Sequence, residues 1–238
     1  MIRLSLLWTL CLFLAPLLLV QGVYVRRCAV RLDEAVGPKQ VTAGSYRMLV
    51  LGDSIVVGVG VKNTSDALPS QLANRLSELR GERISWRAEG RNGDRIQDLV
   101  QRLHLADGVA DLVVINVGVN DVSRLTSMTR WQLELTSLVG ELLKRFRGPI
   151  VLLGLPPMHA FALLPQPLRF ALGVRAQMLD YSLSQVGRLL SRVTYVPTVL
   201  SLDPVYMSED GYHPSAEGVK VLAAKIVEAL DPEKIISN

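Results

Sequence analysis

Residues 46–54 read YRMLVLGDS, an apolar run that ends in a glycine, an aspartate and a serine. A short run of this kind, bounded by turn residues, is typical of a buried strand, and we predict a strand over 46–51. Ser54 therefore stands just beyond the end of a strand. A serine in that place is a candidate nucleophile if a histidine and a carboxylate reach it from elsewhere in the chain.

The rest of the chain alternates short apolar runs with helical patterns. Further strands are predicted at 83–88, 111–117, 150–155 and 193–197. Helices are predicted at 68–79, 96–103, 131–146, 168–190 and 215–230. Strand-helix repetition of this kind implies a parallel sheet with helices on both faces. We therefore expect an α/β fold, a three-layer α/β/α sandwich on a parallel five-stranded sheet.

Polar residues follow the first three predicted strands. Asp53 and Ser54 follow the first, Asn92 and Gly93 the second, and the run GVND at 118–121 the third. Sites in parallel sheets form beyond the carboxyl ends of strands, so these residues are expected on one sheet edge. Each motif alone is also a common turn. Together, the backbone N–H groups of Ser54 and Gly93 and the amide of Asn120 are suitable donors for an oxyanion.

A second motif, Asp210-Gly211-Tyr212-His213, lies just before the last predicted helix. A carboxylate that orients an imidazole, and an imidazole that moves the proton of a serine, complete the group that acyl transfer needs. By itself this spacing is weak evidence, because His213 precedes Pro214 and also suits a surface loop. Its value depends on whether the two ends of the chain meet in space.

The order Gly-Asp-Ser, Gly, Gly-x-Asn-Asp and Asp-x-x-His resembles the block pattern of the SGNH (GDSL-type) hydrolases, an esterase and lipase family. The resemblance runs from about residue 47 to residue 230. It implies a flavodoxin-like fold. No cofactor or metal is expected, because the residues show neither metal-ligand spacing nor a nucleotide-binding motif. The resemblance also implies Ser54 as nucleophile, His213 as base and acid, Asp210 as the orienting carboxylate, and Ser54, Gly93 and Asn120 as the oxyanion hole.

The resemblance implies a serine esterase that forms an acyl-enzyme, similar to bacterial thioesterase and lysophospholipase members. The expected substrate is a small acyl ester, a thioester or a lysolipid. An acyltransferase and a carbohydrate O-acetylesterase with the same triad are the alternatives. A non-catalytic binding module is a third class, which the presence of every motif residue disfavours.

Three charged residues lie beside these motifs. Asp53 and Asp121 are expected to accept hydrogen bonds that fix the loops, rather than to carry protons. Arg95 stands two residues after Gly93 and has two interpretations. It either meets an anionic group of the substrate, or forms a salt bridge to Asp94 or Asp98 or faces solvent, and we favour the salt bridge or the solvent-facing position.

The apolar stretch at 158–172 follows the fourth predicted strand. It contains Phe161, Leu163, Leu164, Leu168, Phe170 and Leu172. We expect either a lid or acyl-binding wall, or a small satellite core beneath the loop. His159, in the same stretch, is a further candidate for the cleft.

The N-terminus is almost continuously apolar from Leu4 to Val20, with Arg3 before it and Arg26, Arg27 and Arg31 after it. A bilayer span needs about 20 apolar residues. We therefore divide the chain into an anchor or signal segment (1–25), a linker (26–45) and the hydrolase domain (46–232). An uncleaved membrane anchor is favoured, with a cleaved signal and export as the alternative and a buried helix of the domain as the least favoured interpretation. The basic C-terminal flank leans toward a cytoplasmic catalytic domain.

Composition excludes several classes of function. The net charge of +4 is spread along the chain without aromatic interleaving, so nucleic-acid binding is disfavoured. The two cysteines, Cys11 and Cys28, lie outside the predicted hydrolase domain, which argues against a thiol nucleophile or a cysteine-based zinc site. No histidine or carboxylate cluster has metal-ligand spacing. The sequence does not predict an oligomeric state.

Overall fold

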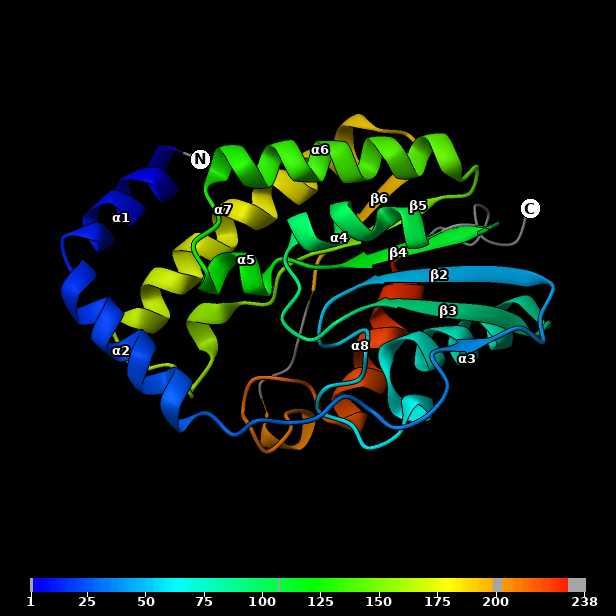
Figure 1. The fold of residues 1–238 in the computed structure, drawn as a ribbon, viewed down its shortest axis with the longest axis horizontal. Coiled ribbons are helices and arrows are strands. Elements are labelled where there is room, and N and C mark those ends of the chain that lie inside the picture. Colours follow the sequence, from blue (N-terminus) through cyan, green and yellow to red (C-terminus); the bar gives the residue numbers. More distant parts are fainter. Residues whose placement is uncertain (1, 107, 199–202, 231–238) are drawn as a thin grey trace.

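The computed structural model describes residues 2–106, 108–198 and 203–230, and a six-stranded sheet forms its centre (Figure 1). Five strands are parallel, in the order β3-β2-β4-β5-β6. Their bounds are β2 (Tyr46–Gly52), β3 (Ile84–Gly90), β4 (Leu112–Asn116), β5 (Ile150–Leu153) and β6 (Val193–Val196). This is the strand order of flavodoxin-like folds. It confirms the α/β sandwich expected from the sequence.

The sixth strand, β1 (Gln40–Val41), lies in the segment expected to be a linker, so the sheet has one strand more than predicted. It pairs antiparallel with β3, where Val41 lies opposite Trp86. The physical reason is that β3 would otherwise be an edge strand with unpaired backbone groups, which an extended neighbouring segment can cover. Ala35, just before β1, is also buried.

Side chains from each strand alternate between two cores, one on each face of the sheet. One face packs on α3 (Leu68–Arg80) and α8 (Ala216–Glu228), and receives Val50 and Val114. The other face packs on α4 (Ile96–Arg102), α6 (Met128–Arg145) and α7 (Leu168–Leu189), and receives Leu49 and Val113. Strands buried on both faces are near-continuously apolar, as the sequence pattern indicates.

The helix boundaries follow from local capping. α3 ends at Gly81, which adopts a left-handed φ of +69°. The Ser215 side chain accepts a hydrogen bond of 3.2 Å from Gly218 N at the start of α8. Both ends agree with the sequence prediction. The predicted hydrolase domain extends to residue 232, and its last two residues lie outside the described part of the chain.

Two glycines let three strands end level with one another. Gly52 closes β2 and lies opposite Gly90 of β3 and Asn116 of β4. A Cβ on Gly90 would lie 2.0 Å from Gly52 O, and a Cβ on Gly52 would lie 2.2 Å from Asn116 O. No side chain fits at either position. The loops that follow these strands therefore start close together.

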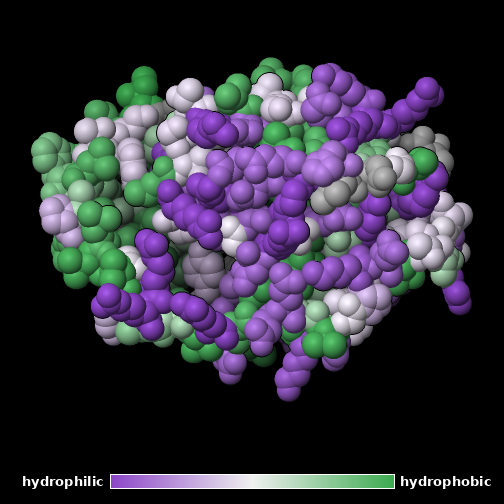
Figure 2. Space-filling view, in the orientation of Figure 1, coloured by the Kyte–Doolittle hydropathy of each residue, from purple (hydrophilic) through white to green (hydrophobic). Residues whose placement is uncertain are grey.

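The N-terminal segment forms two helices, α1 (Ile2–Leu12) and α2 (Ala15–Cys28), which pack beside α7 (Figure 1). Gln21 of α2 donates to Gln166 O and accepts from Leu168 N. Figure 2 shows a largely apolar surface where α1 and α2 lie. Within the described residues, no helix alone has the length and hydropathy of a membrane span; α1 and α2 reach both only as a pair bent by 84°.

Candidate active site

The two ends of the chain meet at the carboxyl end of β2. His213 Nε2 lies 2.9 Å from Ser54 Oγ, although the two residues are 159 positions apart. On the other side of the ring, His213 Nδ1 lies 2.6 Å from Asp210 Oδ2. The structure thus places serine, histidine and carboxylate in one hydrogen-bonded line, as acyl transfer requires.

Asp210 is held as a carboxylate by several donors. Its Oδ1 atom accepts hydrogen bonds from Ser208 Oγ and from the backbone N–H groups of Tyr212 and His213, at 2.7 to 3.0 Å. Burial acts to raise the pKa of Asp210, but these bonds and the His213 ring lower it well below its ordinary value. An ionised Asp210 accepts the Nδ1–H of His213. With Nδ1 turned toward Asp210, Nε2 is the ring nitrogen that faces Ser54 Oγ.

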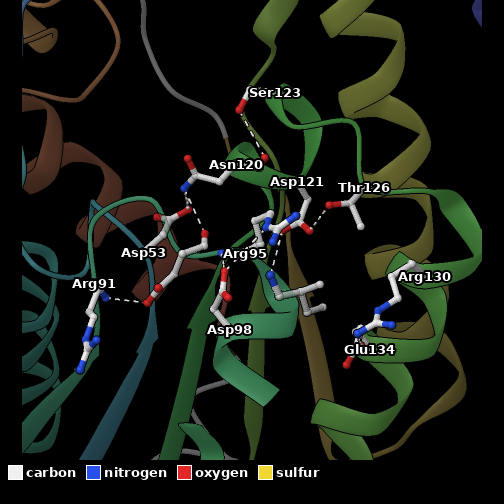
Figure 3. Close-up of polar contacts among 12 residues, drawn as sticks. Asp53, Arg91, Arg95, Asp98, Asn120, Asp121, Ser123, Thr126, Arg130 and Glu134 are labelled. Carbon is white, nitrogen blue, oxygen red and sulfur yellow. Dashed lines mark hydrogen bonds and ion pairs between the residues drawn. The ribbon is translucent and has the colours of Figure 1, made fainter. Parts of the chain in front are cut away.

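Asn120 and Gly93 come to this site from the two neighbouring strands. Asn120 lies on the short helix α5 (Val119–Ser123) after β4, and its Nδ2 donates to Asp53 Oδ2 and to Asp94 O (Figure 3). Gly93 stands directly before Asp94, with a left-handed φ of +85° that favours glycine. The predicted oxyanion donors therefore converge on one edge of the sheet.

Asp53 and Asp121 are buried and accept hydrogen bonds, as expected from the sequence. Asp121 accepts from Ile96 N at 3.0 Å and Thr126 Oγ1 at 2.7 Å, which ties the start of α4 to the chain after α5 (Figure 3). Burial raises the pKa of Asp121. Burial also raises the pKa of Asp53, to about 7, although nearby His213 acts to lower it.

Arg95 forms the expected salt bridge. Its backbone N–H donates to Asp98 Oδ2 at 2.8 Å and its Nε lies 3.7 Å from the same oxygen (Figure 3). The cation next to Gly93 is instead Arg124, which sequence reasoning did not single out. A Cβ on Gly93 would lie 3.2 Å from Arg124 Nη2. The sequence feature that could have identified Arg124 is its position four residues after Asn120, which places both residues on the same side of a helical turn.

A small pocket opens at Ser54 and His213. Its lining is mostly apolar and includes Ile55, Val119, Leu153, Pro156, Phe161, Tyr212 and Leu222. The cavity volume is about 30 Å³. In this structure the pocket has room for a small group only.

The apolar stretch at 158–172 contributes mainly to the core. Phe161, Leu164, Leu168 and Leu172 are buried in the core that faces α6 and α7. Phe161 also lines the pocket, and its ring meets Tyr212 edge-on at 5.4 Å between centroids. Leu163 and Phe170 are exposed. The satellite-core interpretation therefore holds for most of the stretch, and Phe161 alone among these side chains is a pocket wall.

His159 is exposed and does not line the pocket, so the structure does not bring it to the cleft. Among the residues that the structure describes, no group of histidine, cysteine or acidic side chains has the arrangement of a metal site.

A family model and a curated relative both match this chain, and both are of the GDSL-like type. The model of the GDSL-like Lipase/Acylhydrolase family matches residues 50–221. A GDSL-like esterase of Mycobacterium tuberculosis, Rv1075c, is 25% identical over 193 residues. That match covers 77% of this chain and 61% of the relative, so the chain spans about three fifths of the relative's length.

Solved structures show the same fold. TesA superposes with a TM-score of 0.64 at 25% identity, over 78% of this chain and 98% of TesA. Axe2, an acetylxylan esterase from Geobacillus stearothermophilus, superposes with a TM-score of 0.57 at 18% identity, over 79% of this chain and 96% of Axe2.

Proposed function

This chain belongs to the GDSL-like lipase/acylhydrolase family, and from that premise we propose that it is an ester-hydrolysing enzyme that works through an acyl-enzyme on Ser54. His213 Nε2 removes the Ser54 proton as Oγ attacks the acyl carbonyl. The resulting imidazolium is stabilised by Asp210 and then protonates the leaving oxygen or sulfur. Water, activated by the same nitrogen, releases the acid and restores Ser54.

The tetrahedral intermediates carry an oxyanion, for which we propose three donors. They are the backbone N–H groups of Ser54 and Gly93 and the Asn120 amide. They reach the site from the ends of β2, β3 and β4, so the sheet places them near one another, although the Asn120 amide also bonds to Asp53 and to Asp94 O. Preorganised donors of this kind account for a large part of catalysis in acyl transfer.

The observation that carries this proposal is the 2.9 Å contact between His213 Nε2 and Ser54 Oγ. A fluorophosphonate probe tests it, since only an activated serine reacts. We expect the wild type to be labelled and Ser54→Ala to remain unlabelled. Ser184→Ala is the matched control, because Ser184 is a serine of α7 whose hydroxyl donates to Tyr181 O and which does not line the pocket. Equal labelling of wild type and Ser54→Ala would refute the mechanism.

Two substrate classes have specific support. The resemblance to thioesterase and lysophospholipase members, together with the match to TesA, favours an acyl thioester or a lysolipid. The cavity of about 30 Å³, walled by Phe161, favours a short acyl group, as in O-acetyl esters. A series of p-nitrophenyl esters from acetyl to palmitoyl distinguishes them. A maximum of kcat/KM at acetyl or propionyl would support the second class, and a maximum at longer chains the first.

We also propose that α1 and α2 hold the enzyme at a membrane. Their exposed apolar residues form an extended surface, which is rare on proteins that stay in water (Figure 2). The sequence has no acidic residue before Asp33, and Arg3, Arg26 and Arg27 flank the apolar run. Basic residues beside an apolar helix suit an anionic lipid surface.

A further inference from the structure

We propose that Arg124 recognises an anionic group of the substrate, carried close to the ester that Ser54 attacks. This inference rests on the proposed function and adds the charge of the substrate to it. The anionic group is a carboxylate or a phosphate, on either the acyl part or the leaving group. Both are groups that the planar fork of a guanidinium binds well.

The backbone fixes Arg124 to the oxyanion side of the site. Arg124 N donates to Asn120 O at 3.0 Å, so Arg124 lies one helical turn beyond the proposed donor. Its Nη2 atom lies 3.2 Å from where a Cβ on Gly93 would stand. The guanidinium therefore borders the Asn92–Gly93 turn, next to a second proposed donor.

The Arg124 guanidinium has no partner among the described residues. Its side chain is exposed, and it makes no hydrogen bond or ion pair with that part of the chain. The neighbouring carboxylates are already engaged: Asp94 pairs with Arg102, and Asp98 with Arg95. Asp121 is fully buried and bonds to Ile96 N and Thr126. An exposed cation without a structural partner, at the edge of a catalytic site, is available to a ligand.

Other nearby cations have carboxylates closer to them. Arg91, on the same turn as Gly93, is also exposed, but its charge lies in the field of Glu34 and acts to lower the pKa of that carboxyl. Arg130 of α6 pairs with Glu134 at 2.6 Å. Arg130 is a suitable control residue, because it is another exposed arginine whose charge is already partnered.

A cation in this place acts on a charged ester in two ways. It raises the local concentration of an anionic substrate near the site. It also forms a charge-assisted hydrogen bond that holds the carbonyl near the donors. A neutral ester receives neither effect. The signature is thus a dependence of kcat/KM on substrate charge, with hydrolysis of neutral esters preserved.

The experiment compares three chromogenic esters. p-Nitrophenyl acetate is neutral, mono-p-nitrophenyl succinate carries its carboxylate on the acyl part, and 4-acetoxy-3-nitrobenzoate carries it on the leaving group. Each is hydrolysed by the wild type, Arg124→Gln and Arg130→Gln. The two charged esters show on which side of the scissile bond the anion lies.

We expect Arg124→Gln to lower kcat/KM about tenfold for one of the anionic esters, and less than about twofold for the neutral one. Arg130→Gln should leave all three unchanged. Added salt should shrink the gap between wild type and Arg124→Gln. Equal loss on all three esters, or no loss on either charged ester, would overturn this inference while leaving the proposed function intact. Failure of the wild type to hydrolyse any ester would instead refute the proposed function.

Discussion

Both hydrogens of the Asn120 amide are engaged: Nδ2 lies 3.3 Å from Asp53 Oδ2 and 3.1 Å from Asp94 O. Asn120 therefore has to share or exchange one of these bonds when it donates to an oxyanion. The bond to Asp53 is the longer of the two, so it is the one to give way. Asp53 thus sets the resting orientation of a proposed catalytic donor.

The first prediction concerns this positioning role. Asp53→Ala removes the acceptor of the Asn120 amide, whereas Asp53→Asn keeps an oxygen in the same place. We expect kcat to fall about ten- to a hundredfold for Asp53→Ala, less than the ~10²–10³ typical when an oxyanion donor itself is lost. Asp53→Asn should retain most of the activity. Steady-state kinetics on a neutral ester measure this, with circular dichroism to verify folding. Equal losses in both variants would argue against positioning.

The second prediction follows from the pKa of Asp53. Burial raises that pKa to about 7 in the folded protein, against an ordinary value of 3.8. The native state then holds a proton that the unfolded chain has lost. The protonated Asp53 carboxyl therefore makes its full contribution to the free energy of unfolding below about pH 4. This contribution, at most about 4 kcal/mol, is lost as the pH rises to about 7.

Asp53→Asn removes this dependence, because an amide does not titrate in this range. Denaturant unfolding of both proteins at about pH 5 and about pH 8 measures it. The free energy of unfolding of the wild type should fall more than that of Asp53→Asn between the two conditions. A parallel pH dependence in the two proteins would contradict the raised pKa.

The third prediction concerns Asp210. Asp210→Asn replaces the acceptor of His213 Nδ1–H with an amide that is able to donate, so the imidazole takes the wrong tautomer. We expect kcat to fall about 10⁴-fold, as in other serine triads. Fluorophosphonate labelling of Ser54 should slow in parallel. A fall smaller than about tenfold would mean that Asp210 does not orient the ring.

The fourth prediction concerns Phe161. Phe161→Ala removes the buried wall of the pocket beside Tyr212, so longer acyl chains should be accepted and the preferred ester should lengthen. The cost in stability should be about 3–5 kcal/mol, since a large buried ring is lost. Phe170→Ala is the control, because Phe170 is 44% exposed. Ester-series kinetics and denaturant unfolding test both effects, and an unchanged chain-length profile would exclude Phe161 as a wall.

The fifth prediction concerns the N-terminal helices. The full-length protein should float with vesicles that contain anionic lipid. Replacing Leu10 and Phe13, which are 61% and 80% exposed, by serine should weaken binding. Leu189→Ser removes an equally exposed leucine from the end of α7 and should have no effect. Equal flotation of all three proteins would argue against α1 and α2 as the membrane contact.

Local patterns in the sequence were sufficient to predict most of the fold. The strand that leads to Ser54 and the start of α8 at Ser215 depend on apolar periodicity and capping, which act over a few residues. The motif order identified the residues that meet at the site. The 2.9 Å contact between His213 and Ser54 agrees with that prediction.

Long-range neighbours were not predictable in the same way. The strand β1 forms because an extended segment meets the free edge of β3, and nothing within residues 40–41 signals it. Arg124 was missed because its partner across the turn is Gly93, which has no side chain to form a recognisable pair. By spacing alone Arg95 was the better candidate for a contact with the substrate, but its side chain forms a salt bridge with Asp98.

The two glycines that close β2 and β3 bear on how mutational data from this protein should be interpreted. A Cβ on Gly52 would clash with Asn116 O, and a Cβ on Gly90 would clash with Gly52 O. A saturation scan of activity should therefore reject every substitution at both positions as strongly as at Ser54. Unlike substitutions of Ser54, these should also lower the yield of folded protein. Measuring abundance beside activity would separate the residues that perform the reaction from those that only leave space for it.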